Sequence, residues 1–95
     1  MADLEIKHAE SGSGGVFYTI IDGHRAEMTY STAGTTVIII DHTGVPEALG
    51  GQGVGQKLVE AGIAHARERG IKIMPLCPFA KAQFDKHPDW KDVLR

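Results

Sequence analysis

A glycine-rich run, Gly50-Gly51-Gln52-Gly53-Val54-Gly55, is the sequence feature that most constrains the fold. It separates a nearly continuous apolar segment at 35–42 from a segment at 53–69 with apolar residues at helical spacing. Gly70 follows where a left-handed C-cap residue belongs, and residues 71–76 are apolar again. This order predicts a strand, a glycine turn, a helix and a parallel strand, joined as a right-handed βαβ unit.

The chain before the glycine turn predicts strands. Leu4 and Ile6 alternate with charged residues, and 16–21 and 25–31 are rich in aromatic and β-branched side chains. Asp22-Gly23 between the latter two favours a tight hairpin, and 11–15 is expected to be a flexible turn.

The apolar run at 35–42 predicts a central strand covered on both faces, and 79–87 predicts a last helix. We therefore expect an α+β fold whose mixed sheet joins an antiparallel meander to a parallel βαβ unit. Helices pack on this sheet, in a single domain over residues 1–95.

Composition excludes several classes of function. The 95 residues carry a formal net charge of −2 without a basic block, which argues against nucleic-acid binding. The single cysteine allows no internal disulfide, and the apolar run at 37–40 is too short to span a bilayer. The acidic N-terminus lacks the apolar core of a secretory signal. We expect a soluble cytoplasmic protein that binds no membrane and no metal, as a monomer or weak homodimer.

The glycine turn has two interpretations. The conformational one is a loop whose backbone needs positive φ, and the chemical one is a binding site for an anion. A helix N-terminus offers unpartnered N–H groups and the positive end of the helix dipole, which suits phosphate. Gly51, Gly53 and Gly55 would let an anion approach the backbone closely. The spacing fits neither the dinucleotide-binding fingerprint nor the P-loop, because Lys57 is not followed by Ser or Thr.

The turn resembles the acyl-CoA motif of the GNAT acetyltransferase superfamily, [QR]-x-x-G-x-[GA]. Gly53 and Gly55 match its last two positions, whereas Gly50 stands where Gln or Arg is usual. Three further segments extend the resemblance, namely Asp41-His42-Thr43-Gly44-Val45-Pro46, Pro75-Leu76-Cys77-Pro78-Phe79 and His87-Pro88-Asp89-Trp90. From Ile6 to Val93 the chain resembles the single-domain GNAT-like proteins of about one hundred residues found in bacteria and eukaryotes.

The resemblance implies a truncated GNAT-like fold with acetyl-CoA or CoA as the bound substrate. The pantetheine arm would pair with the backbone of Ile39, Ile40 and Asp41. The pyrophosphate would meet the turn and the helix start, at Gly51, Gln52, Gly53, Val54, Gly55, Gln56 and Lys57. Lys81 or Lys86 would reach the 3′-phosphate, and Phe79 would line the channel. Lys57 and Lys81 are equally well explained as solvated surface lysines.

Two side chains are candidates for catalysis. Cys77 ends an apolar strand, where ligands bind in α/β folds, although a lone cysteine is often a small buried hydrophobe. The resemblance implies that Cys77 is the active-site thiol. His42 ends the neighbouring predicted strand and can accept a proton near neutral pH, unless the backbone simply holds it there. We prefer His42 to the other histidines, His8, His24, His65 and His87.

These features together predict an acetyl-CoA-dependent N-acetyltransferase that acts on an amine, directly or through an acetylated Cys77. The alternative is a CoA- or acetyl-CoA-binding module with little or no catalysis, which the short chain favours. A third hypothesis, a nucleotide-phosphate binder unrelated to CoA, predicts tighter binding of ATP than of acetyl-CoA.

Overall fold

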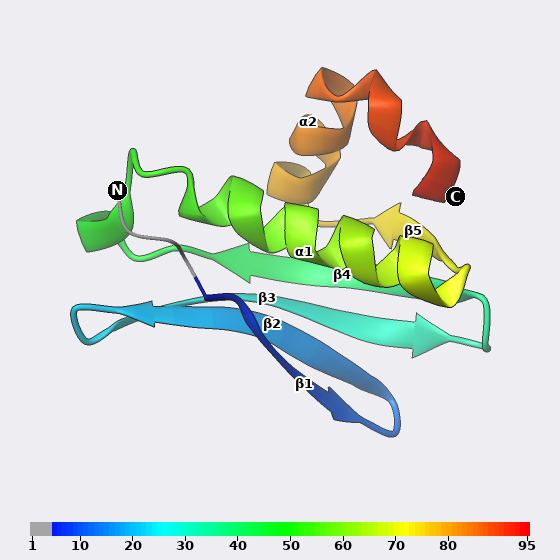
Figure 1. Ribbon diagram of the computed structural model, residues 1–95, viewed down its shortest axis with the longest axis horizontal. Helices are drawn as coiled ribbons and strands as arrows, with labels where there is room; N and C mark the ends of the chain where they lie inside the picture. The colour runs from blue at the N-terminus through cyan, green and yellow to red at the C-terminus, as the bar shows by residue number, and fades with distance from the viewer. Residues whose placement is uncertain (1–4) are drawn as a thin grey trace.

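Within residues 5–95, five strands form one mixed sheet in the order β1-β2-β3-β4-β5 (Figure 1). The computed structural model describes residues 5–95. The strands are β1 (Lys7–Ser11), β2 (Gly14–Ile21), β3 (His24–Ala33), β4 (Val37–Gly44) and β5 (Lys72–Pro75). Strands β1 to β4 pair antiparallel, and β4 pairs parallel with β5. The predicted mixed sheet, a meander joined to a βαβ unit, is confirmed.

The helices follow the predicted order. The short 3-10 turn η1 (Glu47–Leu49) leads into α1 (Val54–Arg69), and α2 (Pro78–Lys86) and the 3-10 segment η2 (Pro88–Val93) follow β5. Figure 1 shows α1 lying along the sheet, with α2 and η2 beside it near β5. Gly53 and Gly70 flank α1 with φ of 73° and 68°, in the left-handed region that glycine adopts without strain. No helix within residues 5–95 is long and apolar enough to cross a bilayer.

The core lies between the sheet and α1. It is built from alternate strand residues, among them Met28, Ile40 and Ile73, against the apolar stripe of α1 that includes Leu58 and Val59. Both α2 and η2 contact α1, so the helices share this face of the sheet.

The expectation that the fourth strand is covered on both faces is wrong. Ile38 and Ile40 are buried, but Val37 and Ile39 on the opposite face are only half-buried. The described helices all pack on the face of Ile38 and Ile40, so the strand alternates in burial despite its unbroken apolar sequence.

The first strand lies further along the chain than predicted. It begins at Lys7, and Leu4 is outside the described residues. The expected turn at 11–15 is also shorter, because Ser11 still belongs to β1 and Gly14 already belongs to β2. All five β1 residues are exposed, so a short apolar alternation could not identify them.

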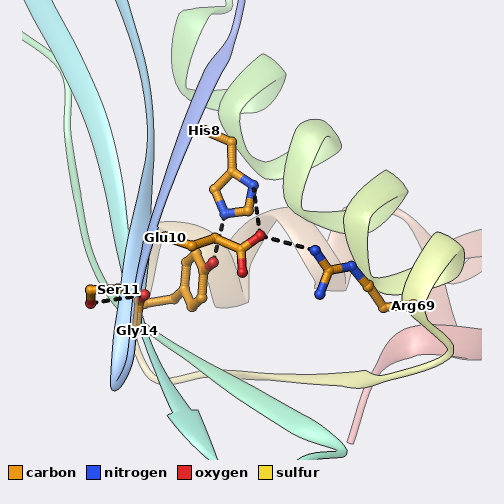
Figure 2. Close-up of polar contacts among 6 residues, drawn as sticks. His8, Glu10, Ser11, Gly14 and Arg69 are labelled. Atoms are coloured by element: carbon orange, nitrogen blue, oxygen red, sulfur yellow. Dashed lines mark hydrogen bonds and ion pairs between the residues drawn. The ribbon is translucent and has the colours of Figure 1, made fainter.

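Side chains of β1 instead attach this edge strand to α1. His8 stacks on Phe17 with ring centroids 4.2 Å apart and meets His65 of α1 edge-on at 4.7 Å. Its Nε2 lies 2.6 Å from the Tyr30 hydroxyl. Figure 2 shows His8, Glu10 and Arg69 pointing toward one another, and Arg69 donates to Glu10 at 2.9 Å.

Candidate functional site

The helix α1, which follows the glycine turn, has no side-chain cap at its N-terminus. Gly51 and Gly53 have φ of 77° and 73°, which explains two of the glycines by backbone conformation. Gly53 is the N-cap residue and provides no side-chain cap, and the first turn holds no acidic residue. The N–H of Lys57 donates to the Gly53 carbonyl at 3.1 Å, so the N–H groups at 54–56 precede the first helical bond. Such donors and the positive end of a helix dipole suit an anion.

A cavity of about 360 Å³ opens at this helix end. Its open-sided lining comes from the segment before the glycine turn, the turn itself, the first turn of α1 and one side of α2. Its lining residues are Val45, Pro46, Glu47, Leu49, Gly50, Gly51, Gly53, Val54, Gly55, Gln56, Phe79 and Gln83. Six of the predicted cofactor-binding residues therefore converge on one cavity, and they are Gly51, Gly53, Val54, Gly55, Gln56 and Phe79.

Gly55 is required by packing rather than by backbone conformation. A Cβ at this position would lie 2.6 Å from Cζ of Phe79, closer than side-chain carbons approach. The Phe79 ring therefore rests directly on the first turn of α1, where it forms the wall between the two helices. The glycine at the last position of the acyl-CoA motif lets α2 approach the cavity.

Strands β4 and β5 separate beside this cavity wall. Their pairing ends at Ile40 and Pro75, while β4 continues to Gly44. The N–H groups of Leu76 and Cys77 both donate to the Ile40 carbonyl, at 3.2 and 3.1 Å. Of the three residues predicted to meet the pantetheine arm, Ile39 and Ile40 are thus already paired with β5. The part of β4 without β5 as a neighbour begins at Asp41.

A bulge in β4 sets the direction of His42. Tyr30 pairs with Ile40 and Thr29 pairs with His42, so Asp41 is an extra residue. Because directly paired residues share a face, His42 lies on the face of Thr29, away from the helices. A Cβ at Gly44 would lie 3.2 Å from Nε2 of His42, which agrees with this direction.

The structure consequently does not bring His42 to Cys77. The bulge turns Thr43, paired with Met28, toward the helices instead. Strict alternation from Ile40 would have predicted the reverse, and the sequence carries no signal for the extra residue. Asp41 accepts a hydrogen bond from the Ser31 hydroxyl at 2.6 Å and does not line the cavity.

Cys77 occupies the N-cap position of α2 and is 5% exposed. Its thiol donates to the Thr43 hydroxyl oxygen across a distance of 3.5 Å. Burial raises the pKa of this thiol, but the Thr43 hydroxyl and the backbone N–H groups at 80, 79 and 43 lower it. The pKa of Cys77 as a result lies below its ordinary value. A thiol at a helix N-terminus with such donors is suited to form a thiolate.

The predicted lysines and Gln52 lie outside the cavity lining. Lys57 Nζ is 3.5 Å from Glu60 on the exposed side of α1, and Lys81 is exposed on α2. Among residues 5–95 no group of His, Cys, Asp or Glu side chains could hold a metal ion.

Two residues that the sequence did not single out belong to this region. Thr43 contacts the Cys77 thiol, and Gln83 lines the cavity one helical turn after Phe79. The i,i+4 spacing of Phe79 and Gln83 was the available signal, because it places both on one face of the predicted last helix.

Comparison with known proteins agrees with the resemblance to acetyltransferases. Residues 16–93 match the family model described as GCN5-related N-acetyl-transferase. A solution NMR structure of a GCN5-like protein from Staphylococcus aureus, itself a proposed N-acetyltransferase, is 44% identical to this chain with a TM-score of 0.76. That match covers 100% of this chain and 91% of the other. No curated protein matches the sequence significantly. The chain belongs to the GCN5-related N-acetyl-transferase family.

Proposed function

We propose that the protein is an acetyl-CoA-dependent N-acetyltransferase that acts on an amine. The observation that carries this proposal is the cavity between the uncapped N-terminus of α1 and the helix that Cys77 begins. The N–H groups at 54–56 would bind the pyrophosphate, and Phe79 would border the pantetheine arm. Family membership supports acetyl transfer as the chemistry of this cavity.

Two routes of acetyl transfer are compatible with these residues. In the direct route the amine nitrogen attacks the thioester carbonyl, a C–N bond forms, the C–S bond breaks and the CoA thiolate leaves. In the second route the Cys77 thiolate attacks first, CoA leaves, and acetyl-Cys77 then reacts with the amine. In either route the amine loses one proton, and the departing thiolate can take it. The lowered pKa of Cys77 supports the second route.

A CoA-binding module with little catalysis is the second candidate, and two observations favour it. Cys77 is buried, with 5% of the residue exposed. His42 points to the other face of the sheet and so is not placed to act as a base beside Cys77. Cytoplasmic location and a monomeric or weakly dimeric state stay predictions for both candidates.

One set of assays separates these functions. Purified protein is first examined by native mass spectrometry for co-purified CoA, and then incubated with acetyl-CoA and a panel of primary amines. An acetylated amine, together with a trapped acetyl group on the Cys77 peptide, supports transfer through the thiol. Amine acetylation that persists in Cys77→Ala indicates direct attack. CoA binding without an acetylated amine indicates the binding module, and absence of CoA binding contradicts both candidates.

A further inference from the structure

Gln83 is an unusual residue of the cavity wall because it is both polar and buried. It lies on α2 with 9% of its surface exposed, on the face that also buries Ala80 and Phe84. Its side-chain amide has no hydrogen-bond partner within residues 5–95. A ligand that fills the cavity would displace water from this amide, and a buried amide without a partner is costly, so the ligand is expected to supply a hydrogen bond.

The accessible part of Gln83 is its amide end. No fully buried side-chain nitrogen or oxygen in residues 5–95 lacks a partner, so the unpaired amide atoms of Gln83 must reach solvent. The solvent space that Gln83 lines is the cavity at the glycine turn. The stem of the side chain is therefore buried in the helix packing, and the amide opens into the proposed substrate site.

A second glutamine, on the α1 side of the cavity, has a hydrogen-bond partner within the protein. Gln56 also lines the cavity, but its amide nitrogen donates to Glu60 at 3.0 Å on the same helix. An i,i+4 pair of this kind holds the Gln56 amide against its own helix without a ligand. Of these two cavity glutamines, Gln83 is the one whose amide makes no hydrogen bond to any of residues 5–95.

The position of Gln83 suggests which part of a ligand it meets. The start of α1 presents backbone donors alone, which suits the phosphates. Gln83 lies six residues after Cys77, about 9 Å along the helix, on the face of Phe79. A carboxamide presents one donor group and one acceptor, which matches a secondary amide better than it matches a phosphate.

We propose that Gln83 binds an amide of the pantetheine arm and thereby selects arm-bearing ligands over nucleotides. This inference rests on the proposed use of acetyl-CoA. It assigns to α2 a polar contact that neither the glycine motif nor the thiol provides.

The test compares two ligands with three proteins. CoA and its nucleotide half, adenosine 3′-phosphate 5′-diphosphate, are titrated by calorimetry into wild type, Gln83→Met and the exposed α2 control Asp85→Asn. Methionine retains the length of the side chain and removes both hydrogen-bonding groups. We expect Gln83→Met to weaken CoA binding about 2- to 13-fold, the effect of one lost hydrogen bond. Its affinity for the nucleotide half, and both affinities of Asp85→Asn, should equal those of wild type.

A direct observation on wild type complements the variant and does not depend on its folding. The side-chain NH₂ resonances of Gln83 should shift when CoA is added and stay in place with the nucleotide half. Equal losses of affinity for both ligands, or unchanged CoA affinity in Gln83→Met, would overturn the assignment. So would Gln83 resonances that respond equally to both ligands. If wild type binds CoA no more tightly than it binds the nucleotide half, this inference fails and the proposed function does not. If wild type binds neither ligand, the proposed function fails with it.

Discussion

At the scale of single residues, the side chain missing from Gly55 determines how closely α2 approaches α1. The sequence motif identified this position, but its interpretation as part of a phosphate cradle was incomplete. The Phe79 ring occupies the space of the absent Cβ. The absence of a side chain at Gly55 thus lets the Phe79 ring form part of the cavity wall.

Gly55→Ala should affect ligand binding more than folding. The added methyl group pushes the Phe79 ring, which is 37% exposed and can move. Better helix propensity of about 0.5–1 kcal/mol offsets part of an overpacking cost of about 1–3 kcal/mol. We expect stability in urea within about 1 kcal/mol of wild type, and CoA affinity about tenfold lower, equivalent to roughly 1.4 kcal/mol. Gly12→Ala, at an open position, should change neither quantity. Unchanged CoA affinity in Gly55→Ala would contradict this account of Phe79.

Thr43 is a positioning residue for the thiol, and its replacement should alter the reactivity of Cys77. Its hydroxyl is the largest of the contacts that lower the pKa of that thiol. Thr43→Val keeps the shape but removes the hydroxyl, so the pKa of Cys77 should rise and less thiolate should form at neutral pH.

The rate of alkylation by iodoacetamide, measured against pH, checks this prediction. The midpoint of the Thr43→Val profile should move to higher pH, and Thr43→Ser should remain near wild type. A Thr43→Val profile that coincides with wild type would show that the helix N-terminus alone activates the thiol.

At the scale of elements, the attachment of β1 to α1 depends on two histidines in contact. Burial lowers the pKa of His8, with Glu10 acting against it and Arg69 with it. Burial, His8 and Arg69 lower the pKa of His65, and Glu10 and Glu68 raise it. Burial and Glu10 raise the pKa of the Tyr30 hydroxyl that His8 contacts, and Arg69 lowers it. The folded protein therefore favours neutral imidazoles at both positions.

Acidification should weaken this attachment. Since both folded-state pKa values lie below the unfolded value of 6.5, the unfolded chain binds more protons as the pH falls through that range. The stability that the neutral His8 and His65 give to the folded state is fully present above pH 6.5. It is lost progressively as the pH falls through their folded-state pKa values.

Urea unfolding at about pH 7.5 and about pH 5.5 measures this loss. His65→Phe keeps an aromatic ring beside His8 but cannot be protonated, so it should lose less stability than wild type between the two conditions. His24→Gln, at an exposed position on β3, should behave as wild type does. Equal losses in wild type and His65→Phe would assign the acid sensitivity to other groups.

At the scale of the whole molecule, the helices lie on one face of the sheet, and the proposed substrate site forms where α1, α2 and the end of β4 meet. A ligand in that cavity would connect elements that otherwise meet through contacts such as the Phe79 ring against Gly55. Ligand binding should therefore be visible in the global stability of the domain.

CoA at about one hundred times its dissociation constant should stabilise the fold by about 2.7 kcal/mol. For a domain of this size the melting temperature should rise by about 10–20 °C. Differential scanning fluorimetry with CoA, acetyl-CoA and ATP measures the shift. A larger shift with ATP than with acetyl-CoA would favour a nucleotide-phosphate binder over the proposed function.

Much of the fold could be predicted from local patterns. The helix start at Val54, its end before Gly70 and the order of the last three elements depend on apolar periodicity and on backbone positions that favour glycine. The resemblance assigned the glycine turn and Phe79 to one cofactor site, and in the structure both line one cavity. These features are readable because each depends on neighbours a few residues away or on a single βαβ rule.

The features that local patterns did not predict depend on packing between distant segments. One extra residue in β4 reverses every side chain beyond it, so His42 faces away from Cys77 and Thr43 takes its place. The face that helices leave uncovered, the position of β1 and the free amide of Gln83 likewise depend on contacts between distant segments. Local periodicity assigns residues to elements, but register and packing between elements determine which side chains meet.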